Sequence, residues 1–326
     1  MTKFVHAVLI AGLLAGSCSA QTSTLKVKPW NNHGAALSLT FDDSRDVHLD
    51  VAVPELNKRH LHATFFLIVS KTTRLDDWRR VHAQGHEIGN HSVTHEHAAD
   101  LNKAGEELQV EDGKKFLDSN FKSDISTFAY PYTEVSPGLL YWVRRYDFAA
   151  RGGRGDNSHV YVKSDVQPDW YALPSQPSYT AYDAATYKSW IDKDLSLNTW
   201  TVLQIHGIGD PSTGFEPIPV KTFIELLDYS KAAEGRGLWV APFGEVAAYF
   251  RAQKVVEAAL AQVSGRDQKF TWQVPTPFPQ GIVLKVAVNG PKSVRLYQAG
   301  HELRPNKDGI YSVAFDSREL VVKGQL

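Results

Sequence analysis

Apolar runs alternate with amphipathic stretches along most of the chain. Residues 36–41, 63–69 and 200–206 are nearly continuous runs of apolar and β-branched side chains, which is typical of strands buried on both faces. Residues 75–83 and 220–234 have the spacing of helices with one apolar face. Strand–helix alternation of this kind predicts a parallel sheet, and roughly seven such repeats are enough to close it into a barrel.

Further helices are predicted between the apolar runs. Residues 47–59 predict a helix, although Pro54 lies inside it. Residues 101–120 predict a long charged helix. A helix is also expected from Pro137 to residue 145, because Ser136 is placed to cap it and proline is favoured at the first helical position.

The pattern changes after residues 264–265. The segment 266–326 contains no convincing helix, and it has short alternating runs at 283–288, 294–298, 310–315 and 320–323. The dipeptides Asn289-Gly290 and Asp308-Gly309, which favour turns, separate them. The sequence therefore predicts a small C-terminal antiparallel β domain after a larger domain at 21–265.

The first 20 residues are typical of a secretory signal peptide. Lys3 supplies a positive start, and the apolar core at 7–15 is too short to cross a membrane. Small residues at the end of the segment favour cleavage after Ala20, with secretion or a periplasmic location expected. Lipid attachment at Cys18 is the alternative. Cys18 is the only cysteine, so neither route leaves a disulfide in the mature body.

Charge gives no sign of a nucleic-acid or membrane partner. The 326 residues have a formal net charge of -1, which provides no basic field to attract phosphates or anionic lipid. The chemistry must therefore be sought in local groups of residues.

A histidine pair and two aspartates are the main chemical candidates. His91 and His95 are four residues apart, so on a helical turn both imidazoles would face one ion. With 13 histidines in the chain, such a pair also arises by chance. Asp42 and Asp43 end the first predicted strand, where one carboxylate could bind a metal and the other could accept a proton.

Other polar residues also follow predicted strands. Tyr130-Pro131-Tyr132 follows one strand, and His206 ends the strand at 200–206. The carboxyl ends of parallel barrel strands open at one mouth, so these groups are expected to converge with the aspartates and histidines. A base near a metal-bound water, opposite a histidine that donates a proton, would form a hydrolytic site.

Four short motifs resemble those of the polysaccharide deacetylases, the NodB-homology group also called carbohydrate esterase family 4. They are Thr40-Phe41-Asp42-Asp43, His91-Ser92-Val93-Thr94-His95, Phe128-Ala129-Tyr130-Pro131-Tyr132 and Leu203-Gln204-Ile205-His206, in the family's order. The resemblance covers roughly residues 35–255. It implies a distorted (β/α) barrel and metal-dependent removal of acetyl groups from sugars.

The resemblance also implies roles at matching positions. Asp42 corresponds to the catalytic base and His206 to the catalytic acid, while the Tyr132 backbone amide stabilises the oxyanion. The implied cofactor is a divalent metal, with zinc favoured, and its expected ligands are Asp43, His91 and His95.

The sequence departs from the family pattern at two positions, so other residues must take over the roles of the missing ones. Ala129 stands where the family commonly has an arginine that orients the base. We predict that Arg151, at a strand end on the same mouth, pairs with Asp42 instead. Arg154 is the alternative.

The second departure concerns the aspartate that should orient His206. The family's usual Asp-x-x-Asp-Trp motif is absent in that form, and the nearest match, residues 165–170, is one residue too long. Asp169 is the expected residue, and Asp156 remains a rival.

The expected function is that of an exported, metal-dependent carbohydrate deacetylase. Its substrate would be an acetylated polysaccharide or oligosaccharide, with an N-acetylglucosamine polymer favoured and acetylxylan the other possibility. The alternative is a carbohydrate-binding protein on a deacetylase scaffold, inactive for want of the motif arginine. The C-terminal β domain is expected to be structural, or else to bind polysaccharide.

Overall fold

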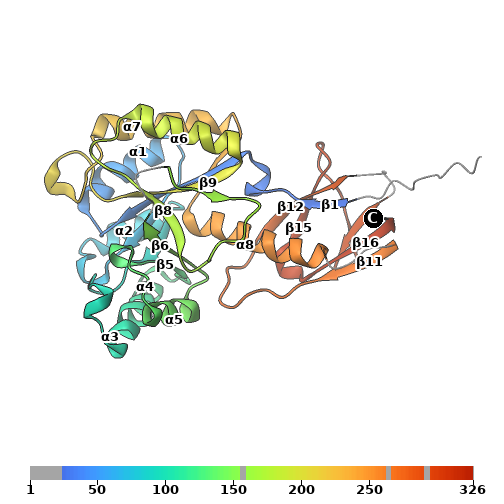
Figure 1. Cartoon of the computed structure of the whole chain (residues 1–326), viewed down its shortest axis with the longest axis horizontal. Coiled ribbons are helices and arrows are strands. Elements are labelled where there is room, and N and C mark those ends of the chain that lie inside the picture. The colour runs from blue at the N-terminus through green and yellow to red at the C-terminus, as the bar shows by residue number, and fades with distance from the viewer. Residues whose placement is uncertain (1–23, 155–158, 262–265, 290–293, 326) are drawn as a thin grey trace, which may run out of the picture.

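The computed structural model describes residues 24–154, 159–261, 266–289 and 294–325, and the predicted signal peptide lies outside them. Figure 1 shows a large α/β body and a smaller body of strands, with the helix α8 lying between them. No helix in the described part of the chain is long and apolar enough to cross a membrane.

The large body is a closed barrel of seven parallel strands, in which β9 pairs with β2 to complete the ring. Its strands are β2 (Ala35–Asp42), β3 (Thr64–Leu67), β4 (Glu87–Asn90), β5 (Thr127–Ala129), β6 (Ala149–Arg154), β8 (Leu173–Pro177) and β9 (Thr199–Ile205). Two short strands extend the sheet: β10 (Leu238–Val240) lies parallel to β2, and β7 (Val162–Lys163) lies antiparallel to β9. The predicted distorted (β/α) barrel is confirmed.

Helices cover the outside of the barrel (Figure 1). They are α1 (Val53–Lys58), α2 (Leu75–Ala83), α3 (Lys103–Glu107), α4 (Gly113–Phe121), α5 (Pro137–Tyr146), α6 (Ala184–Leu197), α7 (Val220–Glu234) and α8 (Phe243–Leu260). The predicted cap of α5 is confirmed, because Ser136 Oγ accepts a hydrogen bond of 3.1 Å from the Leu139 amide.

Two predicted helices contain irregular turns. The stretch predicted at 47–59 begins as a π-helix, His48–Ala52, and continues as α1, with Pro54 in the first turn of α1. The stretch predicted at 101–120 contains another π-helix, Leu108–Asp112, between α3 and α4. Short 3₁₀ turns occur at Trp30–Asn32, Val69–Lys71, Ala98–Asp100, Pro131–Thr133, Pro211–Thr213 and Phe315–Ser317.

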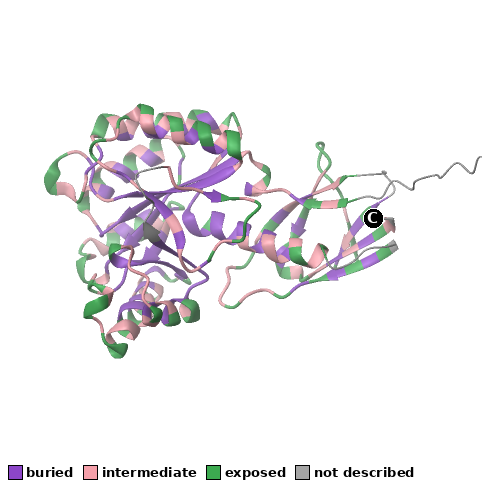
Figure 2. Cartoon of the chain, in the orientation of Figure 1, coloured by how far each residue is buried: buried purple, intermediate pink, exposed green. Residues whose placement is uncertain are grey.

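Apolar side chains fill both faces of the barrel wall. Every residue of β2 is buried, as the continuous apolar run predicts, and Figure 2 shows buried residues concentrated on the barrel strands. Between strands and helices, the rings of Phe41 and Phe65 stack with centroids 5.0 Å apart. A second apolar cluster, which includes Trp200 and Phe243, packs α8 against the barrel. This rigid wall fixes the directions of the side chains that follow each strand.

The small body consists of two antiparallel sheets. One contains β1 (Thr24–Val27), β12 (Val283–Asn289) and β15 (Ile310–Ala314); the other contains β11 (Arg266–Thr271), β16 (Glu319–Gln325), β13 (Arg295–Gln298) and β14 (His301–Leu303). The expected antiparallel character is confirmed. The predicted division at 21–265 is wrong for β1, because this N-terminal strand pairs with β12 and completes the C-terminal sheet.

The helix α8 connects the two bodies through its side chains. Tyr249, Ala252 and Val256 belong to the apolar cluster of the small body. The Tyr249 hydroxyl donates to the Lys28 carbonyl at 2.7 Å and accepts from the Lys285 amide at 3.1 Å. The last helix of the barrel is therefore part of the core of both bodies.

Candidate functional site

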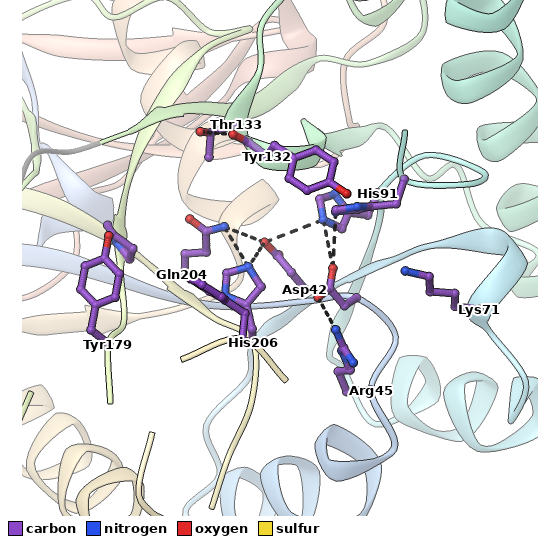
Figure 3. A pocket seen from close by; sticks show the side chains of 13 residues that line it. Asp42, Arg45, Lys71, His91, Tyr132, Thr133, Tyr179, Gln204 and His206 are labelled. Atoms are coloured by element: carbon purple, nitrogen blue, oxygen red, sulfur yellow. Dashed lines mark hydrogen bonds and ion pairs between the residues drawn. The ribbon is translucent and has the colours of Figure 1, made fainter. Parts of the chain in front are cut away.

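A pocket of about 410 Å³ opens where the barrel strands end (Figure 3). Asp42 is the last residue of β2, and His91 and His206 come directly after β4 and β9. The side chains that line it are those of Asp42, Asp43, Arg45, Lys71, His91, His95, Tyr132, Thr133, Pro177, Tyr179, Gln204, His206 and Phe215, together with the adjoining backbone. The expected convergence at one mouth is thus present in the structure.

The histidine pair lies on a loop and not on a helical turn, so the expectation of a helical i, i+4 face is wrong. Ser92 and His95 have positive φ angles of 69° and 63°, which no α-helix contains. Side chains satisfy the loop amides: Ser92 Oγ accepts from the His95 amide at 2.9 Å, and Gln109 Oε1 accepts from the amides of Val93 and Thr94. These bonds bring the two imidazole centroids within 4.7 Å.

His91 is oriented by a backbone carbonyl. Its Nδ1 lies 2.7 Å from the Ala129 carbonyl, so Nδ1 carries the proton and Nε2 has a free lone pair. The ring is buried, and Nε2 has no hydrogen-bond partner among the described residues. This arrangement is typical of a histidine that binds a metal, because the second nitrogen fixes the tautomer and the ring direction.

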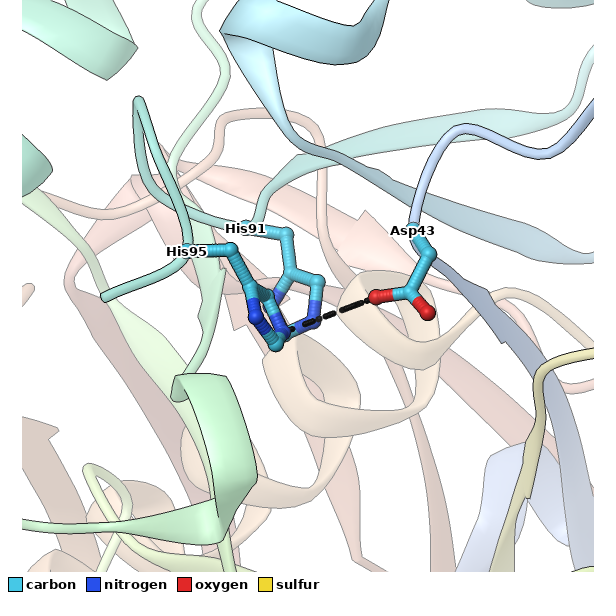
Figure 4. A group of neighbouring side chains, drawn as sticks. All are labelled: Asp43, His91 and His95. Carbon is cyan, nitrogen blue, oxygen red and sulfur yellow. Dashed lines mark ion pairs between the residues drawn. The ribbon is translucent and has the colours of Figure 1, made fainter. Parts of the chain in front are cut away.

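Asp43 completes a three-residue group with His91 and His95 (Figure 4). Its Oδ1 lies 3.7 Å from His91 Nε2 and 3.5 Å from His95 Nε2. Its backbone has a φ of 81°, a conformation rare outside glycine, which turns the residue out of the strand direction. Its other oxygen, Oδ2, accepts a 3.0 Å bond from Arg45.

The three residues suit a divalent cation. Ligand bonds of about 2.0–2.2 Å in a tetrahedron place ligand atoms about 3.3–3.6 Å apart, close to the distances between Asp43 and the two imidazoles. Asp43 Oδ1, like His91 Nε2, is buried without a hydrogen-bond partner among the described residues. Because a buried polar atom without a partner is costly, these two atoms indicate that the site accommodates a further group.

Asp42 lies beside this group and is held by Arg151. The Arg151 Nη2 donates to Oδ1 and Oδ2 of Asp42 at 2.5 and 2.6 Å, and both side chains are buried. The predicted contact between Arg151 and Asp42 is confirmed. The alternative partner, Arg154, has a side chain outside the described residues.

The register of two strands explains how Arg151 reaches the base. In the β5–β6 pairing, Ala129 and Arg151 are direct partners. The guanidinium therefore comes from the strand next to the position where the family motif has its arginine. It also lies over the Phe66 ring, 5.0 Å from the centroid, which fixes it from one side.

Electrostatics favour the charged form of Asp42. Burial raises the pKa of this carboxyl, but the Arg151 guanidinium, with smaller contributions from His91 and His206, lowers it by more. The net effect holds the pKa of Asp42 well below its usual range. The carboxylate is therefore charged at neutral pH and available as a proton acceptor.

His206 faces Asp42 from the end of β9. Its Nε2 lies 3.8 Å from Asp42 Oδ2, and its backbone carbonyl is close to His48 Nε2, at 2.5 Å. Burial lowers the pKa of His206, whereas Asp42 and Asp43 oppose this effect. Its Nδ1 is buried without a hydrogen-bond partner among the described residues.

The expectation that Asp169 orients His206 is wrong. Asp169 is exposed in the turn before β8, where its Oδ1 accepts from the Tyr171 amide at 3.0 Å, and it does not line the pocket. An aspartate in this exposed turn caps its own backbone and does not reach the barrel mouth. The rival, Asp156, lies outside the described residues.

Comparison with known proteins agrees with the motifs. Residues 31–150 match the sequence model of the family described as polysaccharide deacetylase. This part of the chain is therefore similar in sequence to the polysaccharide deacetylase family.

Among curated relatives, a peptidoglycan-N-acetylglucosamine deacetylase of Bacillus cereus is 28% identical over 122 residues, which covers 37% of this chain and 44% of the relative. A gellan lyase of a Bacillus species is 24% identical over 280 residues, covering 78% of this chain and 11% of the relative. The chain thus spans less than half the length of these relatives. The solved peptidoglycan deacetylase PdaC of Bacillus subtilis has a TM-score of 0.49 and 17% identity, over 72% of this chain and 99% of that one.

The third deacetylase motif contributes Tyr132 to the pocket. Tyr132 has a left-handed backbone, with φ 52° and ψ 13°, and the next residue, Thr133, also has a positive φ. The Tyr132 ring lies against His95 and stacks on His97 at centroid distances of 4.6 and 3.6 Å. Strained backbone of this kind is concentrated at functional sites, and here it occurs beside the histidine pair.

Sequence reasoning assigned no role to Gln204, which also contacts Asp42. Its Nε2 donates to Asp42 Oδ2 at 2.9 Å and lies 3.4 Å from His206 Nε2. Ser175 Oγ donates to Gln204 Oε1 at 3.3 Å, which orients the amide. The signal available in the sequence was the position of Gln204, two residues before His206 on the same strand, because alternate residues share a face.

Aromatic side chains surround the mouth of the pocket. Tyr132 and Phe215 are 42% and 59% exposed, large fractions for apolar rings, and Tyr179 is half-buried. Aromatic faces at the edge of a polar pocket are suited to the apolar faces of sugar rings. The pocket therefore combines a group of carboxylate and imidazole side chains with exposed aromatic rings at its mouth.

Proposed function

We propose that this protein is a metal-dependent deacetylase of an acetylated polysaccharide or oligosaccharide. The observation that carries the proposal is the arrangement at the barrel mouth. Asp43 Oδ1 and His91 Nε2 are buried without hydrogen-bond partners among the described residues, and they lie close to His95 Nε2. A charged carboxylate, Asp42, lies beside them. The family match over residues 31–150 supports the same reaction class.

Each polar group of the pocket has a role in this reaction. Asp43, His91 and His95 would hold a divalent cation, with zinc favoured by the nitrogen-rich ligand set. The chemistry supplied by a cation in that position is Lewis acidity toward water and toward an acyl oxygen.

Asp42 is the proposed general base, since its carboxylate is charged and faces the same point as the ligands. Arg151 and Gln204 hold that carboxylate in place, so the base needs no reorganisation before it accepts a proton from water. His206, across Asp42 from the ligands, is the proposed acid for the departing amine or alcohol.

The backbone amide of Tyr132 is the proposed oxyanion donor, on the strength of its place in the third family motif and at the pocket wall.

The contact between Arg151 and Asp42 also bears on the alternative, an inactive carbohydrate-binding protein. That alternative was based on the absence of the motif arginine at position 129. Arg151 provides a guanidinium to the base from the neighbouring strand, so the reason for inactivity is removed.

N-acetylglucosamine polymers are the proposed substrates, and acetylxylan is the second possibility. The test is release of acetate by the metal-loaded protein from an N-acetylglucosamine tetramer and from acetylated xylan, before and after treatment with a chelator. Acetate from the tetramer that is lost with chelator and restored by zinc is the expected result. Unchanged glycans in every metal-replete reaction, with sugar binding retained, would favour the inactive binding protein.

Export is a further part of the proposal. The positive start and short apolar core of residues 1–20 support cleavage after Ala20, with lipid attachment at Cys18 as the alternative. Expression with and without residues 1–20, followed by N-terminal sequencing of the exported protein, distinguishes the two. A mature protein that begins at Gln21 is expected, and one found only inside the cell with Met1 retained would contradict export.

A further inference from the structure

Positively charged side chains outnumber negatively charged ones around the pocket, and one of the positive side chains, Lys71, has no charged partner among the described residues. Among the residues that line it, only Asp42 and Asp43 are acidic, whereas Arg45 and Lys71 are basic. Arg151 pairs with Asp42, and Arg45 pairs with Asp43 at 3.0 Å. The two negative charges are thus already matched, and the ammonium of Lys71 is in excess.

Lys71 is placed to meet a ligand. It ends the 3₁₀ turn Val69–Lys71 that follows β3, its side chain is exposed, and no ion pair or side-chain hydrogen bond is found for it in the described structure. Figure 3 shows its side chain extending toward the site on the side away from Tyr179.

Arg45 adds to the positive character of this side. Its side chain is 38% exposed, its Nη2 contacts Asp43, and its Nε is buried without a partner in the described structure. An arginine held in this way keeps its charge and fixes the direction of its remaining donors. A divalent cation on Asp43 and the two histidines would make the same region more positive still.

We propose that the preferred substrate is an anionic glycan that contains N-acetylglucosamine, in which the sugar next to the acetylated one carries a carboxylate that Lys71 binds. This inference rests on the proposed deacetylase function and names its substrate class. The acetylated sugar lies over Asp42 and the metal ligands. The neighbouring carboxylate then lies toward Lys71 and Arg45, and the rest of the glycan extends past Tyr179 and Phe215.

The test compares two oligosaccharides that differ only in charge. The first is an alternating tetrasaccharide of N-acetylglucosamine and glucuronic acid, and the second is the same molecule with its carboxyl groups reduced to alcohols. Binding of each to the zinc-loaded full-length protein is measured by calorimetry at low and high salt. We expect the charged form to bind about fivefold more tightly at low salt, the upper range for an exposed ion pair, and to lose this advantage at high salt.

Two variants assign the effect to one residue. Lys71→Met should weaken binding of the charged tetrasaccharide about fivefold and leave the reduced one unchanged. Lys221→Met removes a lysine on α7 whose side chain is 90% exposed and outside the pocket, so it should change neither. In turnover assays, Lys71→Met should raise KM for the charged substrate with kcat unchanged, because the ammonium binds a part of the sugar that does not react.

The outcomes separate this inference from the proposed function. Equal affinity for the two tetrasaccharides, or no effect of Lys71→Met, overturns the anionic substrate even when the N-acetylglucosamine tetramer is deacetylated. If the protein binds the charged form selectively and Lys71→Met abolishes this preference, the anionic substrate is supported. If no acetate is released in the same experiment, only the deacetylase function is contradicted. Failure of both tetrasaccharides to bind overturns the inference.

Discussion

Arg151 gives the sharpest test of how the base is held. Its guanidinium and the Asp42 carboxylate are 1% and 0% exposed, and the two are joined by hydrogen bonds of 2.5 and 2.6 Å. In Arg151→Met an apolar side chain replaces the arginine, so the buried carboxylate loses its main counter-charge. Removing one partner of a buried ion pair costs about 3–5 kcal/mol, and we expect the free energy of unfolding at pH 7 to fall by about that amount.

A double-mutant cycle separates the pair from simple loss of packing. The metal-free proteins are unfolded in urea as wild type, Arg151→Met, Asp42→Asn and the double variant. Asp42→Asn leaves the guanidinium buried without its partner, so it should also destabilise the protein, whereas the double variant removes both charges. The double variant should therefore lose less than the sum of the single losses, with a coupling energy of about 2 kcal/mol or more. The exposed Arg145→Met is the matched control and should change stability by about 0.5 kcal/mol or less.

The contribution of Asp42 to stability should change with pH in a definite direction. The pKa of Asp42 is depressed in the folded protein, so its contribution to stability is present above the ordinary carboxyl pKa and is lost as the pH falls. Without Arg151, burial dominates and the carboxyl takes up a proton at higher pH. The difference between wild type and Arg151→Met should therefore begin to shrink at a pH above about 4, where the carboxyl of the folded variant is protonated, and should go on shrinking as the pH falls below about 4, where the wild type loses its own contribution. The reasoning is refuted if the stability losses of the two single variants simply add up in the double variant. It is also refuted if the difference in stability between wild type and Arg151→Met does not change with pH. Where Arg151→Met fails to fold, Arg151→Lys retains the charge and should recover part of the coupling.

Two further predictions concern other groups. The His91→Ala, His95→Ala double variant should bind no zinc when zinc is supplied at equimolar concentration, as measured by elemental analysis. The control His301→Ala, in the small β domain, should bind zinc as the wild type does. A folded double variant with one zinc per chain would contradict the ligand assignment. Burial raises the pKa of Asp147, although Lys114 opposes the effect, and neither carboxylate oxygen has a hydrogen-bond partner in the described structure. The free energy of unfolding should therefore fall as the pH rises above about 4, by at most about 1.4 kcal/mol per pH unit. Asp147→Asn should flatten this dependence in urea unfolding at pH 5 and pH 8. The same pH dependence in both proteins would show that Asp147 is not the cause.

Most of the barrel and the group of site residues were predictable because they depend on local sequence. Continuous apolar runs mark strands buried on both faces, and polar residues directly after them lie at one mouth, which brought Asp42, Asp43, His91 and His206 together. Arg151 was chosen by the same rule and does contact Asp42, although it lies inside β6 and is level with Ala129 at the end of β5.

Features set by distant residues were not predictable in this way. The loop of His91 and His95 depends on Gln109, 15 or 16 residues further along the chain, so its shape was mistaken for a helix. The strand β1 pairs with β12, more than 250 residues away, and nothing in its own four residues indicates that partner. Asp169 was chosen by resemblance to a motif, but its turn keeps it on the surface.

The central claim is that Asp42, beside the metal ligands, is the base of a deacetylation reaction. It is tested most directly by acetate release from an N-acetylglucosamine tetramer, measured for the zinc-loaded wild type and for Asp42→Asn with its zinc content determined in parallel. The account predicts that Asp42→Asn retains zinc and loses activity by roughly 10²–10⁴-fold, the usual contribution of general acid–base catalysis. Near-normal acetate release by zinc-loaded Asp42→Asn would contradict it.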